Sequence, residues 1–186
     1  MSATANDMIE RIENQLGQLI LYVGSIDALA EAYRAADGLD NDPFLFGTVY
    51  DALWDAAVIR IGALWDNSKG VASLPKLAKH LRSLDRPDAR AVAKEVAAAE
   101  TPQWERLKAR RDRIVAHADF PLDPYAFEAQ FSVNVKDLRH EAERVERILA
   151  GARRAFGTEP VCFEVLKSDA TSNAKRFLSR FRAERS

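Results

Sequence analysis

Apolar residues recur at intervals of three and four along most of the chain, which is the period of an amphipathic α-helix. The first such stretch covers residues 9–33 and predicts one long helix that ends near the Asp37-Gly38 turn. Gly17 and Gly24 lie within it and lower its helix propensity, but they do not interrupt the apolar pattern.

A second amphipathic stretch is predicted from Pro43 to about Asn67. Asp42 is expected to cap this helix, because proline is favoured at the first helical position that follows a cap. Its apolar stripe is broad and includes Trp54 and Trp65. A broad stripe is typical of a central helix that is buried on more than one side.

Prolines and glycines divide the next part of the chain into further helices. A short helix begins at Ser73-Leu74-Pro75 and is broken near Pro87, and an alanine-rich helix follows to about residue 99. Thr101-Pro102 opens another helix, and His117 lies at or just beyond its end. Residues 118–134 are predicted to form a loop with a short extended piece near 127–133.

The last part of the chain predicts two more helices. Asn134 is expected to cap a long helix that Gly157 stops, and Ser168 or Asp169 is expected to cap a terminal basic helix. Residues 160–166 alternate weakly and are expected to be extended. The pattern predicts an all-α protein with a helical bundle at residues 1–157 and a C-terminal extension at 158–186.

The charges are clustered, although the formal net charge is only −1. Residues 104–118 hold five bases and two acids, and residues 167–186 hold six bases and two acids. Local clusters attract phosphate more than total charge does, so these two segments are the candidates for contact with nucleic acid.

The remaining composition favours a cytoplasmic protein without metal or cofactor. Cys162 is the single cysteine, which excludes an intrachain disulfide, and it is interpreted as a buried thiol. No signal peptide and no apolar run of membrane-spanning length is found. His80 and His140 are expected at the surface, and three histidines without a spaced pair do not indicate a metal site.

The segment Arg110-Arg111-Asp112-Arg113-Ile114-Val115-Ala116-His117 carries the candidate chemistry. Histidine can give or take a proton near neutral pH, and arginine can hold a phosphate through paired hydrogen bonds. At about 100° per residue, Arg110 and Arg113 lie on nearly the same helix face as His117, and Arg111 lies about a third of a turn away. Which arginine points inward is left open.

This segment resembles the motif of the HEPN superfamily, an arginine with a polar follower and then a histidine after four to six residues. Arg111, Asp112 and His117 fit it with five intervening residues, Arg110 would fit with six, and Arg113 has only three and falls outside the pattern. The context resembles the abortive-infection branch, because an apolar helix ending in Asp66 precedes a serine-leucine helix at Ser73-Leu74, and Asp119 follows the histidine. The resemblance covers roughly residues 5–157 in helix order.

The resemblance implies a HEPN-like helical bundle and a metal-independent endoribonuclease that attacks RNA through its 2′-hydroxyl. Arg111, Asp112 and His117 would be the catalytic residues, and Lys108, Arg110 and Arg113 are expected to bind RNA. The implied partners are RNA, a second copy of the chain and an antitoxin protein. The family also implies an alternative, a catalytically inactive module that binds RNA, a nucleotide or a protein.

Simpler interpretations remain beside these. His117 and the arginines could do no more than stabilise the negative end of a helix dipole. Trp54, Trp65 and Trp104 could stack on bases, but their place on apolar stripes favours the core. The terminal helix could grip phosphates, or it could be docked by Phe177 and Phe181 with its arginines in solvent. A third possibility is an interaction protein whose broad helix stripes form a dimer interface.

Overall fold

Seven α-helices are present in the residues that the computed structural model describes, 4–35, 43–68, 70–98, 102–116 and 133–183. For 32–35, 43–45, 102–103, 113–116, 177–178 and 180–183 it describes the backbone alone. The helices are α1 (Ala5–Ala35), α2 (Pro43–Trp65), α3 (Leu74–Ser83), α4 (Pro87–Ala97), α5 (Pro102–Ala116), α7 (Val135–Ala155) and α8 (Glu164–Ala183). The predicted all-α fold is confirmed.

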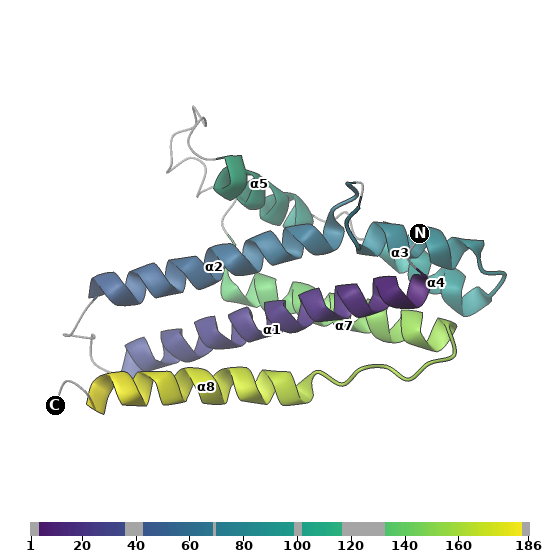
Figure 1. The fold of residues 1–186 in the computed structure, drawn as a ribbon. Coiled ribbons are helices and arrows are strands. Elements are labelled where there is room, and N and C mark those ends of the chain that lie inside the picture. The colour runs from purple at the N-terminus through teal and green to yellow at the C-terminus, as the bar shows by residue number, and fades with distance from the viewer. Residues whose placement is uncertain (1–3, 36–42, 69, 99–101, 117–132, 184–186) are drawn as a thin grey trace.

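Helix α1 is the centre of the bundle (Figure 1). It packs lengthwise against α2, α7 and α8, while α3 and α4 pair at the end where α1 begins. Helix α5 lies outside the bundle against α2. The chain thus places a helix with five basic residues next to its most apolar helix.

The periodic apolar residues of α1 form the core, as the sequence predicts. The side chains at 0% exposure in this helix follow helical spacing, and they are Ile9, Ile12, Leu16, Leu19 and Ile26. Fully burying such a side chain contributes about 1.5–3 kcal/mol each. This stripe therefore supplies much of the energy that assembles the bundle.

Both predicted ends of α7 are confirmed. Asn134 and Asp137 form a capping box, in which the Asn134 side chain accepts from the Asp137 amide and Asp137 accepts from the Asn134 amide. At the other end Gly157 adopts φ +74°, and the amide of Thr158 donates to the carbonyl of Arg153. Glycine takes this left-handed conformation without steric cost, so the helix stops there. Asp42 and residues 118–132, for which a cap and a loop are predicted, lie outside the described residues.

The predicted start of the terminal helix is wrong. Helix α8 begins at Glu164 rather than at Ser168 or Asp169, and residues 158–163 have no regular secondary structure. The weak alternation of apolar residues at 160–166 does not correspond to one face of a β-strand. Phe163 is buried at 4% exposure, whereas its alternating neighbours Val161 and Val165 are 45% and 67% exposed. Phe163 anchors the start of the helix in the core.

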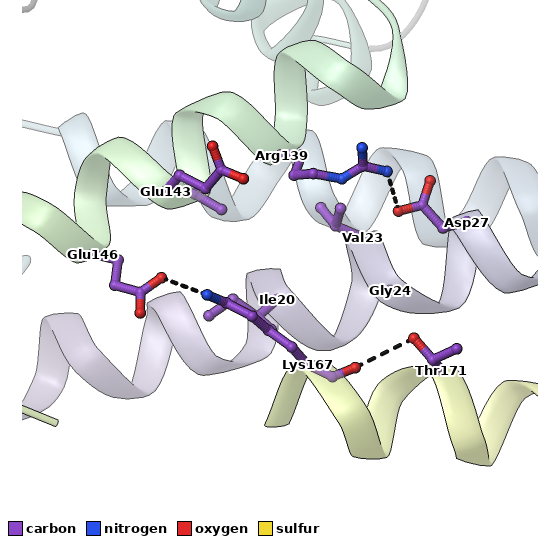
Figure 2. Close-up of a pocket in the computed structure, with 10 residues that line it drawn as sticks. Ile20, Val23, Gly24, Asp27, Arg139, Glu143, Glu146, Lys167 and Thr171 are labelled. Carbon is purple, nitrogen blue, oxygen red and sulfur yellow. Dashed lines mark hydrogen bonds and ion pairs between the residues drawn. The ribbon is translucent and has the colours of Figure 1, made fainter. Parts of the chain in front are cut away.

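Helix α8 is docked closely along α1. A Cβ at Gly24 would lie 2.6 Å from the Cβ of Ala170, so a glycine is needed where the two backbones approach. A small hollow of about 190 Å³ between α1, α7 and α8 is spanned by ion pairs (Figure 2). Lys167 reaches Glu146 at 3.0 Å, and Arg139 reaches Asp27 at 2.5 Å. The division of the chain into a helical bundle at 1–157 and a C-terminal extension at 158–186 stays a prediction.

Cys162 is exposed, which corrects its interpretation as a buried thiol. It lies between the exposed Val161 and the buried Phe163, in a connection without regular secondary structure. Across the part of the chain that the structure describes, no helix has the length and apolar character required to cross a membrane.

A buried ion pair joins α1 to α7. Arg153 donates from Nε and Nη2 to the two carboxylate oxygens of Glu13, at 2.8 and 2.6 Å. The side chains are 13% and 9% exposed. The two parallel hydrogen bonds restrict how α1 and α7 are aligned along their axes.

A buried carboxyl group also lies beneath α2. Glu141 of α7 is 1% exposed, and its Oε1 accepts a 2.8 Å hydrogen bond from Nε1 of Trp65. Its Oε2 has no hydrogen-bond partner among the described residues, and Nη1 of Arg144 lies 3.9 Å away. Burial raises the pKa of Glu141, and the attraction of Arg144 only partly opposes this. Trp54 and Trp65 are buried, so the predicted core role of these two is confirmed.

The first prediction concerns the pH dependence that Glu141 causes. Because its pKa is higher in the folded state, the folded chain keeps a proton that the unfolded chain loses as the pH rises above 4.5, the ordinary pKa of a glutamate. Stability therefore falls as the pH rises from 4.5 through the folded-state pKa. Glu141→Gln replaces the carboxyl group with an amide that does not titrate. The stability of this variant relative to that of the wild type should therefore rise between pH 4 and pH 7. Urea midpoints across this range measure it, and a difference that does not change with pH would contradict it.

Candidate functional site

Helix α5 is held on α2 by apolar contacts along one side. Leu107 is 1% exposed, and the rings of Trp104 and Trp65 are 5.8 Å apart. Pro102 stands at the first helical position, where its missing N–H costs nothing. With its apolar side against α2, α5 brings its basic residues to the edge of the α2–α5 contact.

Arg111 crosses α2 at Gly62. A Cβ at position 62 would lie 2.1 Å from Cδ and 3.0 Å from Cγ of Arg111, far inside contact distance. Gly62 is buried, and its missing side chain is the space that the arginine stem fills. The glycine thus fixes the path of the Arg111 side chain.

The guanidinium of Arg111 is oriented by its neighbour Asp112. Nε donates to Oδ1 of Asp112 at 2.8 Å, and Nη2 donates to the same oxygen at 2.5 Å. These bonds use two of the five N–H donors of the guanidinium. The two side chains are 25% and 46% exposed, so an incoming ligand can reach both.

Asp66, just beyond the end of α2, adds a negative charge near Arg111. Hydrogen bonds from the side chain and amide of Ser68 lower the pKa of Asp66, and the positive charges of Arg111 and Lys76 lower it further. The carboxylate is therefore ionised at neutral pH. The sequence marks Asp66 as the acid that ends the second helix, and the structure places its charge near that of Arg111.

Arg110 acts on a second carboxyl group of α2. Burial raises the pKa of Asp55, the charge of Arg110 lowers it, and the nearby Asp51 raises it. Arg110 and Arg111 therefore both interact with groups on α2. Of the other predicted RNA-binding residues, Lys108 is exposed, and for Arg113 the structure describes the backbone alone.

His117 follows the last residue of α5 in the sequence and lies outside the described residues. The structure thus brings Arg111 and Asp112 together, and the place of His117 beside them stays a prediction. In the described part of the chain, no group of three His, Cys, Asp or Glu side chains could hold a metal ion.

Two residues of this site are missed by the sequence analysis, Asp55 and Gly62. Their spacing carries a signal, because Asp55, Gly62 and Asp66 stand at positions i, i+7 and i+11 of the helix that the sequence predicts from Pro43 to about Asn67. Such positions share a face. A stripe of acid, glycine and acid within an otherwise apolar helix marks the face on which a basic helix can lie.

The comparison with known families agrees with this arrangement. The model of the family HEPN_AbiU2, described as AbiU2, matches residues 3–177. The helical fold and this match define the chain as a HEPN domain of the abortive-infection type. Within that class, the chain belongs to the AbiU2 family.

The predicted resemblance is thereby confirmed, and the matched region extends beyond residue 157 through most of α8. No curated protein and no solved structure gives a match to the chain. The chemistry of the site must therefore be argued from its own residues.

Proposed function

We propose that the chain is a metal-independent endoribonuclease. The imidazole of His117 takes the 2′-hydroxyl proton, and the 2′-oxygen forms a bond to the adjacent phosphorus. The bond from phosphorus to the 5′-oxygen breaks, and that oxygen takes a proton from an imidazolium. The products are a 2′,3′-cyclic phosphate and a 5′-hydroxyl end. Arg111 stabilises the charge that develops on the phosphate.

The observation that carries this proposal is the oriented guanidinium of Arg111. Gly62 holds its stem, Asp112 holds two of its N–H groups, and it remains partly exposed six residues before His117 in the sequence. A donor fixed before the ligand arrives does not have to reorganise during the reaction, which is the source of electrostatic catalysis.

We also propose that two copies of the chain form the working enzyme. The mechanism needs one imidazole as base and one imidazolium as acid, and each chain supplies a single motif histidine. A homodimer supplies both. A role as the toxin of a phage-defence pair, opposed by an antitoxin protein, is part of the same proposal. Sedimentation equilibrium at micromolar concentration tests the dimer, and a monomeric active enzyme would exclude it.

The decisive experiment is cleavage of an end-labelled single-stranded RNA in the presence of EDTA. The expected products end in a 2′,3′-cyclic phosphate, and a 2′-O-methyl RNA of the same sequence remains intact because its nucleophile is blocked. Failure to cleave a panel of RNAs would exclude the enzyme. RNA binding that depends on Arg111 without any cleavage would identify the chain as a binding module instead.

A second prediction concerns Gly62. In the Gly62→Ala variant the new Cβ displaces the Arg111 stem, and a displacement of about 1 Å near reacting groups can lower a rate roughly 100-fold. Alanine also favours a helix over glycine by about 0.5–1 kcal/mol, which offsets part of the cost of moving the Arg111 stem, so the loss of stability should be small. Cleavage rate and urea midpoint are measured together.

The matched control for Gly62→Ala is Gly47→Ala on the same helix, because a Cβ at Gly47 meets no atom within 4 Å. It should gain about 0.5–1 kcal/mol of stability from helix propensity and keep full activity. If Gly62→Ala cleaves RNA as fast as Gly47→Ala, the position of Arg111 does not matter for the reaction.

A further inference from the structure

A second hollow lies beside the two aromatic rings at the start of α5. Its volume is about 520 Å³, within the range of roughly 300–1,000 Å³ that small-molecule sites occupy. Its wall is formed by side chains of α3, α4 and α5 and of the end of α2, including Trp65, Trp104, Lys79 and Arg82. It combines aromatic rings with cationic groups, and none of these residues belongs to the Arg111 site.

The Trp65 ring in the wall of this hollow is held in place by residues of α7. Nε1 of Trp65 donates to the buried Glu141 at 2.8 Å, and the guanidinium of Arg144 lies over the Trp65 ring at 5.6 Å. Trp104 is tilted by 44° against Trp65 and is only half-buried. A fixed, partly exposed indole is a surface on which a planar base can stack.

The cationic side of the hollow is formed by α3. Lys79 and Arg82 are exposed, stand three residues apart, and form no ion pair with another residue in the described ranges. Lys76 differs from them, because its Nζ donates to the carbonyls of Ser68 and Val71 and so fixes the connection after α2. Two cations are thus available for an anionic ligand.

We propose that this hollow binds one nucleotide unit, with the base on Trp104 and the phosphate on Lys79 and Arg82. Aromatic stacking accepts any base, and paired cations beside it fit the phosphate attached to that base. The unit could be a free nucleotide or part of an RNA strand. The second source rests on the proposed ribonuclease function.

The location relates the hollow to the Arg111 site. Trp104 and Arg111 are seven residues apart on α5, which corresponds to about 10 Å along a helix. A single RNA strand that runs parallel to the axis of α5 would contact both Trp104 and Arg111. The hollow would then hold a nucleotide away from the bond that is cut, and so contribute to substrate affinity without taking part in the chemistry.

Tryptophan fluorescence can measure this binding directly. The background is Trp54→Phe, which leaves the two tryptophans of the hollow as the only tryptophans, with His117→Ala added to prevent cleavage. Adenosine monophosphate and a short single-stranded RNA serve as probes. Both should quench the emission, whereas adenosine and inorganic phosphate alone should bind at least about tenfold more weakly, because each supplies only one of the two contacts.

Two variants test the contacts separately. Lys79→Ala combined with Arg82→Ala should weaken nucleotide binding about tenfold and lower its salt dependence. Trp104→Leu keeps apolar volume but removes the stacking face, and it should weaken binding at least about fivefold. Lys94→Ala, which removes an exposed cation of α4 outside the hollow, is the matched control and should bind normally.

The outcomes separate the two proposals. RNA binding that the variants weaken, in a wild-type chain that does not cleave RNA, supports the hollow and excludes the nuclease. Cleavage with unchanged affinity in both variants overturns the hollow and leaves the nuclease in place. Quenching by the RNA alone identifies the strand as the source, and quenching by both probes identifies the shared nucleotide unit. Absence of quenching by either probe overturns the inference.

Discussion

Replacing Arg111 with alanine is expected to lower RNA cleavage by about 10²–10³-fold, the usual effect of removing one fixed donor to a developing negative charge. The loss arises because the guanidinium is already oriented by Asp112 and by the space at Gly62. Arg111→Lys should recover only a small part of the rate, since an ammonium group lacks the planar paired donors. Initial rates on one labelled RNA measure the effect.

The expected effect of Arg111→Ala lies in the chemistry and not in the fold. Arg111 pairs with a neighbour on its own helix, so the main loss is the packing of its stem on Gly62, and the urea midpoint should fall only modestly. Arg106→Ala, which removes a guanidinium from the same helix one turn earlier, is the control for lost charge and should retain most activity. Equal losses in Arg106→Ala and Arg111→Ala would reduce the role of Arg111 to general attraction of RNA.

His117→Ala should cause a loss of similar size, because a positioned general base contributes about 10²–10⁴-fold. If His117 and Arg111 act on the same phosphate, the double variant should be little slower than the worse single variant. Multiplication of the two losses would mean that they act in separate steps. The helical circular dichroism signal should be unchanged in all three variants.

The largest effect on stability is expected from Arg153→Ala. It leaves the carboxylate of Glu13 unpaired at 8% exposure, and removal of one member of a buried pair costs about 3–5 kcal/mol. The loss should separate α7 from α1 and lower the urea midpoint strongly. Glu13→Leu together with Arg153→Leu should recover much of the stability, because two apolar side chains need no partner.

A surface pair provides the matched control for Arg153→Ala. Arg139 and Asp27 also join α7 to α1, at 2.5 Å, but their side chains are 49% and 39% exposed. Arg139→Ala should therefore cost at most about 1 kcal/mol. A loss in Arg153→Ala no larger than that in Arg139→Ala would show that water reaches the Glu13 pair and that burial does not set its energy.

Helix positions could be predicted from the sequence wherever local chemistry is decisive. The 0% exposure of Ile9, Ile12 and Leu16 repeats the period of their sequence positions, and the ends of α7 follow from Asn134 and Gly157. The start of α8 could not be predicted in this way. Its helical character begins where Phe163 is buried against other helices, and that contact is not local.

Some residues of the candidate site could likewise be predicted from local sequence, and others could not. The motif residues Arg111 and Asp112 could be identified from their type and spacing, because phosphate chemistry limits which side chains can serve. Gly62 could not, since in the sequence it is one more glycine within a helix. Its role depends on the path of α5 across α2, which brings the Arg111 stem within 2.1 Å of the missing Cβ.

The sequence by itself determined that this chain is a set of amphipathic helices with an arginine-histidine motif of the HEPN kind, because periodicity and residue chemistry act over a few neighbouring positions. Only the tertiary structure decided which groups face one another. It set Arg111 on Gly62, placed Glu141 in hydrogen-bond contact with Trp65, and brought Trp104, Lys79 and Arg82 to the wall of one hollow. These pairings join distant segments, and they are fixed by how side chains fill the space between packed helices.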